Sequence, residues 1–320
     1  MSILKKVLEL SELRNVFWTY LLTQGIELPS SSLFQVNLDT FLKLLFDPCD
    51  AVGNILIIQG GTRHMNKDSY YIKTASLFLS RKIRLFIFEK YAPVINHRYA
   101  HDVSDCIKYI KEKYEGPVVV IGYSMGGMLL LSYLAHGFDD ADMYIPTCCS
   151  FDFHGFRSRI ENNTLFALLQ AKDYEAFGVA NYEELLELAD TQCAEQHIFM
   201  DQAITKFNQH SKNWAHKTIY VVAENDPLTK DHEDTISLLQ DPPLRYVVKQ
   251  GWHCCLSSVH LTAILAYNYC VAAQTPLTTS EVCPSSATEL SRKAVVEARK
   301  QIRMEDVSVA ETVKIFGYNM

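Results

Sequence analysis

One stretch, from Val118 to Leu131, constrains the fold of this chain more than any other. Four β-branched residues lead into Gly122-Tyr123-Ser124-Met125-Gly126, and an apolar run typical of a helix follows. This pattern predicts a strand that turns sharply into a helix with Ser124 at the junction, an arrangement called a nucleophile elbow. Glycines are needed two positions on either side of the serine, because a Cβ atom there would collide with the neighbouring strand or helix.

The rest of the chain alternates between strand and helix patterns. Strands separated by helices form a parallel sheet covered on both faces, so we predict an α/β fold with a mostly parallel sheet. A hairpin over 33–46, with its turn at 37–40, precedes the alternation. Besides the elbow, the predicted strands are 54–59, 84–88, 142–148, 218–223 and 244–248, and the predicted helices are 69–81, 100–114, 232–239 and 256–273.

Length, charge and cysteine content limit the function. At 320 residues the chain is long enough for one large α/β domain. A net charge of -7 argues against a nucleic-acid-binding protein, because phosphate contacts require clustered lysine and arginine. The nine cysteines are odd in number and irregularly spaced, and no secretory signal precedes them. We therefore expect reduced thiols in a cytoplasmic protein.

The two ends of the chain carry further predicted helices. The segment 3–23 has apolar residues at helical spacing, but charges interrupt them too often for a transmembrane helix. Two interpretations stay open for it, a helix packed on the domain and a peripheral membrane contact. A linker rich in Thr, Ser and Pro follows residue 274, and capping patterns at Ser286 and Ser308 predict two more helices. The chain thus divides into a domain over 1–274 and a C-terminal helical extension over 275–320, which either folds back or forms a homodimer contact.

Two residues that would complete the chemistry of Ser124 follow later strands. A serine hydroxyl is a weak nucleophile unless a base removes its proton and a third group orients that base. Asp226 comes just after the strand 218–223, and His253 lies in the loop after the strand 244–248. Either residue alone could be a turn former or a surface side chain. The three together, in this order and at strand ends, predict a catalytic triad.

The reaction also needs donors for the oxyanion that forms on the substrate. We expect the backbone N–H of Met125, directly after the nucleophile, and that of Gly61, which follows the strand 54–59. Alternatively, Gly60 and Gly61 form an ordinary glycine-rich turn. No histidine or cysteine spacing is typical of a metal site, so neither a metal nor an organic cofactor is expected. The adjacent pairs 148–149 and 254–255 are interpreted as structural thiols.

An aromatic-rich helical insert, from 151 to about 215, separates the strands 142–148 and 218–223. An insert at this point is predicted to form a lid over the C-terminal edge of the sheet. Its aromatic side chains suit either the wall of an apolar pocket or the core of the lid itself. A pocket of that kind favours esters with an apolar acyl portion.

Four segments carry a resemblance to a known family. They are Gly122-Tyr-Ser-Met-Gly-Gly, Asn225-Asp226-Pro227, Gly251-Trp-His253 and the run Met-Asp-Gln-Ala-Ile-Thr over 200–205. Across 33–274 the chain resembles the α/β-hydrolase superfamily. Within it, the chain is similar to the YheT-like branch, which includes the mammalian ABHD-type hydrolases and yeast medium-chain ethyl ester synthases. The resemblance implies an α/β-hydrolase fold and ester chemistry with Ser124 as nucleophile, Asp226 as acid and His253 as base.

Three features depart from the pattern of that branch. Gln59 stands where the family usually has a histidine, so we expect the oxyanion loop to be anchored differently. Trp252 replaces a second glycine beside His253, and the membrane anchor of many eukaryotic members is absent. We expect a serine hydrolase that cleaves carboxylic esters of small molecules. Acyl transfer to an alcohol or thiol, and an inactive binding protein that keeps the fold, stay open as alternatives.

Overall fold

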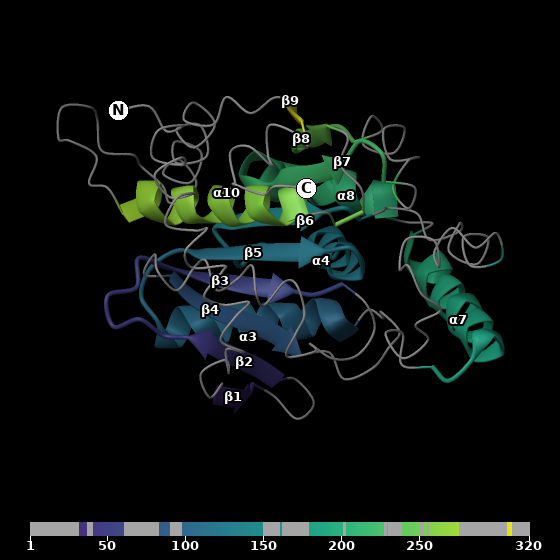
Figure 1. Ribbon diagram of the computed structural model, residues 1–320, viewed down its shortest axis with the longest axis horizontal. Helices are drawn as coiled ribbons and strands as arrows, with labels where there is room; N and C mark the ends of the chain where they lie inside the picture. Colours follow the sequence, from purple (N-terminus) through teal and green to yellow (C-terminus); the bar gives the residue numbers. More distant parts are fainter. Residues whose placement is uncertain are drawn as a thin grey trace, which may run out of the picture.

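The computed structural model describes residues 32–36, 41–60, 83–89, 98–149, 161, 179–200, 203–226, 229, 239–249, 253–254, 256–274 and 306–308. Within these residues the chain forms one nine-stranded sheet with the order β1-β2-β4-β3-β5-β6-β7-β8-β9 (Figure 1). Only the pairs that involve β2 are antiparallel, and all other neighbouring strands run parallel. The strands are β1 (Ser32–Gln35), β2 (Phe41–Phe46), β3 (Gly53–Ile58), β4 (Ile83–Glu89), β5 (Val118–Tyr123), β6 (Met143–Thr147), β7 (Ile219–Ala223), β8 (Leu244–Lys249) and β9 (Asp306–Ser308).

This strand order, with the elbow on its central strand, is that of the α/β-hydrolase fold, which confirms the predicted fold class. The described helices are α3 (Arg98–Lys113), α4 (Met125–Ala135), α7 (Tyr182–Met200), α8 (Ala203–Trp214), the short 3-10 helix η3 (Ala215–Lys217) and α10 (Leu256–Gln274). Because parallel strands end at one common edge, the loops after β5, β7 and β8 meet there.

Successive side chains of β5 point alternately into two separate hydrophobic cores. Val118 and Val120 point into a cluster with α3, α4 and α8, whereas Val119, Ile121 and Tyr123 point into a cluster with α10. All of these side chains are buried, and each apolar one stabilises the fold by about 2 kcal/mol. α10 therefore covers one face of the sheet, and α3, α4 and α8 cover the other (Figure 1).

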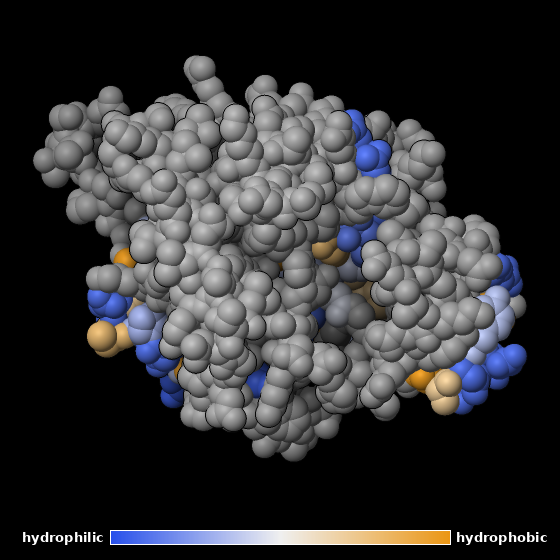
Figure 2. Space-filling model, viewed as in Figure 1, coloured by the Kyte–Doolittle hydropathy of each residue, from blue (hydrophilic) through white to orange (hydrophobic). Residues whose placement is uncertain are grey.

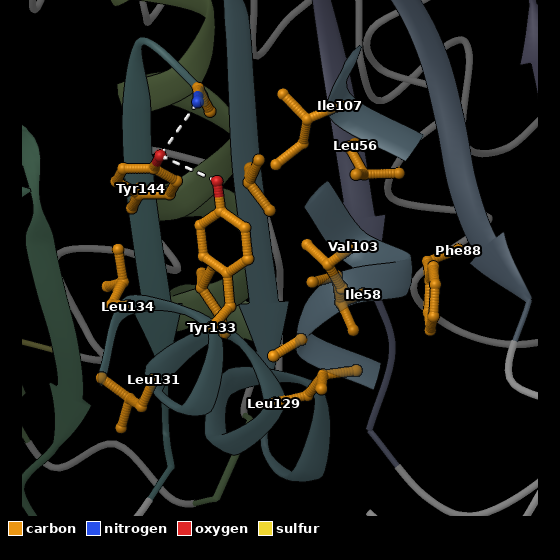
Figure 3. Packing of buried hydrophobic residues seen from close by; sticks show 14 of the residues in the cluster. Leu56, Ile58, Phe88, Val103, Ile107, Leu129, Leu131, Tyr133, Leu134 and Tyr144 are labelled. Carbon is orange, nitrogen blue, oxygen red and sulfur yellow. Dashed lines mark hydrogen bonds between the residues drawn. The ribbon is translucent and has the colours of Figure 1, made fainter. Parts of the chain in front are cut away.

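A buried pair of tyrosines lies at the far end of α4 from the elbow. Tyr133 donates to a carboxylate oxygen of Asp140 at 3.0 Å, and its hydroxyl lies 3.4 Å from that of Tyr144. The backbone N–H of Ala141 donates to Tyr144 (Figure 3). Burial raises the pKa of both phenols, so they stay protonated and act as neutral hydrogen-bonding groups. These contacts belong to the core and lie among the apolar side chains that surround Tyr133 (Figure 3).

The predicted hairpin is confirmed by the register of β1 and β2, in which Gln35 pairs with Phe41 and Ser32 pairs with Leu44. Its turn at 37–40 lies outside the described residues. The same holds for Gly61, Trp252, the predicted helices 3–23 and 69–81, residues 232–238 of the predicted helix 232–239, and most of the helical extension. None of the described helices is both long enough and apolar enough to cross a membrane.

The two described α-helices of the predicted insert, α7 and α8, pack differently. Over 182–191, α7 buries only Leu185, Leu188 and Ala189, and the described side chains at its end of the molecule are mostly hydrophilic (Figure 2). α8, in contrast, packs into the main core through Phe207 and Trp214, which are fully buried against α4 and its neighbours. Most of 151–178 lies outside the described residues, so the lid stays a prediction, while α8, inside the predicted bounds of the insert, packs as part of the domain core. α8 is a core helix of the domain, because its two large aromatic side chains fill that core.

The C-terminal extension contains a strand that the capping patterns did not predict. β9 pairs in parallel with β8, with Val248 opposite Val307 and Lys249 opposite Ser308. The segment before Ser308 thus joins the sheet edge. The extension folds back on the domain at this point, while the homodimer contact stays a prediction.

Candidate active site

Ser124 lies in the sharp turn between β5 and α4. Its backbone has φ 50° and ψ -118°, a left-handed conformation that is rare for a residue with a side chain. The turn is held at both ends. The N–H of Ser124 donates to the carbonyl of Thr147 at 2.9 Å, and its own carbonyl accepts from the N–H of Met128 at 3.0 Å. The strained residue is therefore fixed by the backbone of β6 and by the first turn of α4.

Close packing explains why the turn requires glycine. A Cβ atom on Gly126 would lie 2.1 Å from the carbonyl oxygen of Ile58 and 2.5 Å from that of Gln59, both at the end of β3. Backbone atoms of a central strand cannot move aside, so only glycine is accommodated. A Cβ on Gly122 would meet the backbone of Gly126 at 2.5 Å. The clash that the sequence predicted is present on both sides of Ser124.

The structure brings Ser124, Asp226 and His253 together. The imidazole Nε2 of His253 lies 2.9 Å from Oγ of Ser124, and its Nδ1 lies 2.8 Å from Oδ2 of Asp226. The Asp226 side chain is 0% exposed and the His253 side chain 16% exposed. A continuous chain of hydrogen bonds thus runs from a buried carboxylate through the imidazole to the serine hydroxyl.

The directions of these hydrogen bonds follow from the donor inventory. An ionised carboxylate only accepts, so Nδ1 of His253 carries the proton that faces Asp226. In the neutral imidazole the lone pair then lies on Nε2, where it accepts from the hydroxyl of Ser124. This arrangement is ready to take a proton from the serine.

Backbone contacts at neighbouring strand ends place the acid. The N–H of Glu224 donates to the carbonyl of Val248, so the ends of β7 and β8 remain paired up to the site. Asp226 then forms a tight turn, with its N–H donating to Ala223 and its carbonyl accepting from Thr229. His253 is followed by Cys254, which has φ 44° and turns the chain toward α10.

The predicted oxyanion donors are described only in part. Met125 is the first residue of α4, and the first N–H groups of a helix have no partner within the helix itself. Gly61 lies outside the described residues. Its neighbour Gly60 lies against the nucleophile, since a Cβ there would be 3.0 Å from Cβ of Ser124. The loop that follows β3 therefore starts beside Ser124, where a backbone N–H could donate to the oxyanion.

Buried thiols lie beside the site. The sequence analysis interpreted 148–149 and 254–255 as structural thiols but did not predict that Cys148 and Cys254 adjoin the site. Cys148 directly follows β6 with φ 46° and forms a side-chain hydrogen bond with Cys254. That hydrogen bond and burial raise the pKa of Cys148 well above its ordinary value. Burial likewise raises the pKa of Cys149. The cysteines Cys49, Cys106, Cys148, Cys149, Cys254 and Cys270 are free. Among the residues that the structure describes, no group of three or more His, Cys, Asp or Glu side chains is arranged to hold a metal ion.

Comparison with known proteins gives similarity to solved structures only. No family model and no curated protein matches the chain. The chain is similar to Est1E from Butyrivibrio proteoclasticus, with 13% identity, a TM-score of 0.48, and coverage of 76% of this chain and 98% of that one. It is similar to a soluble variant of monoglyceride lipase from Saccharomyces cerevisiae, with 17% identity, a TM-score of 0.49 and coverage of 74% and 93%. It is also similar to the Pyrococcus furiosus esterase PF2001, with 11% identity, a TM-score of 0.48, and coverage of 76% of this chain and 87% of that one. At these values the assignment of the α/β-hydrolase fold rests on strand order and on the geometry of the elbow.

Proposed function

We propose that this protein is a serine hydrolase that cleaves carboxylic esters through an acyl-serine intermediate. The observation that carries the proposal is the unbroken hydrogen-bond chain from Asp226 through His253 to Ser124. A strained backbone holds the serine at the edge of the sheet, as expected for a residue that must present its oxygen to a substrate.

In the first half of the reaction, Oγ of Ser124 attacks the ester carbonyl carbon. Its proton moves to Nε2 of His253, and the buried Asp226 carboxylate stabilises the imidazolium that forms. The carbonyl oxygen becomes an anion and accepts from the backbone N–H groups of Met125 and Gly61. When the tetrahedral intermediate collapses, the C–O bond to the alcohol breaks and His253 gives its proton to the leaving alkoxide.

In the second half, water takes the place of the alcohol. His253 removes a proton from the water as it attacks the acyl-serine, and then returns that proton to Oγ of Ser124. The free acid leaves and the resting state is restored. No metal or organic cofactor takes part in these steps, because the serine, the imidazole and the backbone donors supply the nucleophile, the base and the electrostatic stabilisation.

The substrate preference and the closer relationship are finer parts of the proposal. The aromatic composition of the insert supports an ester with an apolar acyl portion, and the motifs around Ser124, Asp226 and His253 support the YheT-like branch. Hydrolysis rates for p-nitrophenyl esters of graded acyl length test this preference. Rates that fall steadily from acetate to longer acyl chains would contradict it.

A fluorophosphonate probe tests the mechanism directly. The wild-type protein is expected to be labelled at Ser124 and to lose ester hydrolysis in proportion. Ser124→Ala should give neither labelling nor hydrolysis, while the control Ser132→Ala, which alters another buried residue of α4, should retain both. Equal labelling of wild type and Ser124→Ala would remove Ser124 from the mechanism. A wild-type protein that is folded but neither labelled nor active would favour a binding protein.

Product analysis in the presence of an alcohol distinguishes hydrolysis from acyl transfer. Water as the acceptor gives the free acid, whereas transfer gives a new ester. We expect the free acid to predominate at low alcohol concentration. A product that is mainly ester under these conditions would assign the protein to acyltransferases.

A further inference from the structure

The N-terminal half of α10 carries two buried hydroxyl side chains on one face. Ser258 and Thr262 are both 0% exposed and lie one helical turn apart. Both come shortly after His253 in the chain, in a helix that otherwise packs apolar residues on the sheet. Since buried polar groups cost free energy unless they are hydrogen-bonded, the partners of these two hydroxyls are informative.

Thr262 is the partner of Tyr123, the residue directly before the nucleophile. The two hydroxyl oxygens lie 2.6 Å apart, and the Thr262 hydroxyl donates to the carbonyl of Val259 at 2.8 Å. Because the single proton of Thr262 is used in that bond, Tyr123 must donate to Thr262. Tyr123 therefore ties the end of β5 to α10 by one directed hydrogen bond.

Ser258 is the partner of Cys148, at the end of β6. The Cys148 thiol lies 3.8 Å from Oγ of Ser258, to which it donates, and Cys254 is its second side-chain partner, so its single proton serves one of the two at a time. Cys254 directly follows His253, so this second contact reaches the histidine turn itself. Both cysteines have left-handed backbones, with φ 46° and 44°, and such strain persists only where surrounding contacts hold it.

The strand-end partners belong to the same rigid piece of backbone as the nucleophile. Tyr123 pairs with Thr147 in the sheet, and the N–H of Ser124 donates to the carbonyl of Thr147 at 2.9 Å. Cys148 comes next in the chain and donates its N–H to Val221 at 2.8 Å. Any shift of α10 relative to Tyr123 and Cys148 is therefore a shift of the histidine turn relative to Ser124.

We propose that Tyr123, Cys148, Ser258 and Thr262 are positioning residues that hold His253 within hydrogen-bonding distance of Ser124, an inference that rests on the proposed function. The imidazole is carried by a short turn, and a displacement of about 1 Å is enough to lower the rate about 100-fold. Apolar packing of α10 is non-directional and permits sliding. The directed hydrogen bonds set the register between the helix and the strand ends.

Steady-state kinetics on an ester substrate test the proposal with matched pairs of variants. Tyr123→Phe and Thr262→Val each remove one end of the directed bond. We expect either change to lower kcat about tenfold with KM unchanged, and the double variant to be no worse than the single ones. Tyr133→Phe and Thr218→Val are the controls, because they remove buried hydroxyls that bond elsewhere, to Asp140 and to the carbonyl of Trp214. The controls should lose thermal stability while kcat is unchanged.

A second measurement does not depend on activity. The proton on Nδ1 of His253, which bonds to Asp226, gives a downfield proton resonance. It is expected to shift or broaden in Tyr123→Phe and Thr262→Val but not in the controls. If the wild type has no ester activity, the proposed function fails. The change of this resonance in Tyr123→Phe and Thr262→Val then tests by itself whether these residues position His253.

Two results would overturn the inference. One is a wild-type kcat and an unchanged resonance in Tyr123→Phe. The other is an equal loss of kcat in the control variants. Should Tyr123→Phe fail to fold, Thr262→Ser keeps the hydroxyl and should restore the kcat lost in Thr262→Val. A Thr262→Ser variant that is as slow as Thr262→Val would also count against the proposal.

Discussion

The nucleophile end of the site (residues 122–128) and its histidine end (residues 253–262) are built by different means. Backbone atoms hold Ser124, through hydrogen bonds to β6 and through glycines that fit only because they lack Cβ. Side chains hold the segment that carries His253, through Asp226, Thr262 and the thiols of Cys148 and Cys254. The first construction tolerates almost no added atoms. The second depends on individual polar groups, and we expect the fold to persist when one of them is removed.

Asp226→Asn should give the largest effect and should act on the histidine end alone. An amide at this position donates to Nδ1 as readily as it accepts, so the imidazole is no longer held with its lone pair on Nε2. We expect kcat to fall about 10⁴-fold with little change in folding. Ester hydrolysis rates and the far-ultraviolet circular dichroism spectrum provide the measurement.

Asp241→Asn is the matched control for that change, because Asp241 accepts a hydrogen bond from Ser211 at 3.0 Å outside the site. Its kcat should equal that of the wild type. If both variants lose activity to the same extent, the role of Asp226 is structural.

Gly126→Ala should give the next largest effect and should act on the nucleophile end. The new Cβ lies 2.1 Å from a backbone oxygen of β3, which cannot rotate away. We expect a loss of about 3 kcal/mol in the free energy of unfolding, at the upper end for overpacked cores. Urea denaturation measures this loss.

Gly127→Ala introduces a milder clash in the same turn. Its Cβ would lie 2.7 Å from Cβ and Sγ of Cys149 and 3.0 Å from the carbonyl oxygen of Gly122, so every contact is longer than the 2.1 Å approach at Gly126. The expected loss is smaller, about 1 kcal/mol. Equal losses for the two alanine variants would show that the 2.1 Å approach to β3 costs no more than the 2.7 Å approach to Cys149.

The smallest effect is expected in the alkylation rate of Cys148. A hydrogen bond with Cys254 and burial raise the pKa of Cys148, so little thiolate is present at pH 8 and iodoacetamide should label it only after local opening. Ser258→Ala removes one weak contact worth about 0.5–1 kcal/mol and should accelerate labelling roughly two- to fivefold. Mass spectrometry follows the labelling, with the exposed Cys49 as the internal control. An unchanged rate would mean that Ser258 does not hold the histidine end.

The sequence revealed the nucleophile end because its determinants are local. This end consists of a β-branched run, two glycines and a serine that are adjacent in the chain. The spacing alone predicts that a Cβ atom at either glycine would clash with the neighbouring backbone. Asp226 and His253 were also predictable, because the order of strands fixes which loops share an edge. In the structure both side chains lie within hydrogen-bonding distance in one chain with Ser124, while their catalytic roles stay a proposal.

The contacts that hold the histidine end were not predictable in this way, because they depend on how α10 is placed on the sheet. Ser258 and Thr262 did leave a signal, since two hydroxyls one turn apart in an apolar helix indicate a buried polar face. The same limit explains α8 and β9. Phe207 and Trp214 are aromatic like the rest of the insert, and a three-residue strand is too short to show a period.

The parallel pairing of β9 with β8 has a consequence for synthesis of the protein. A ribosome makes β8 before residues 306–308, so until β9 follows, the edge of β8 at 247–249 lacks its β9 partners. This edge belongs to β8, the strand that leads to His253. Chains released early, before Asp306 is translated, would keep this edge exposed and are the species we expect chaperones to capture.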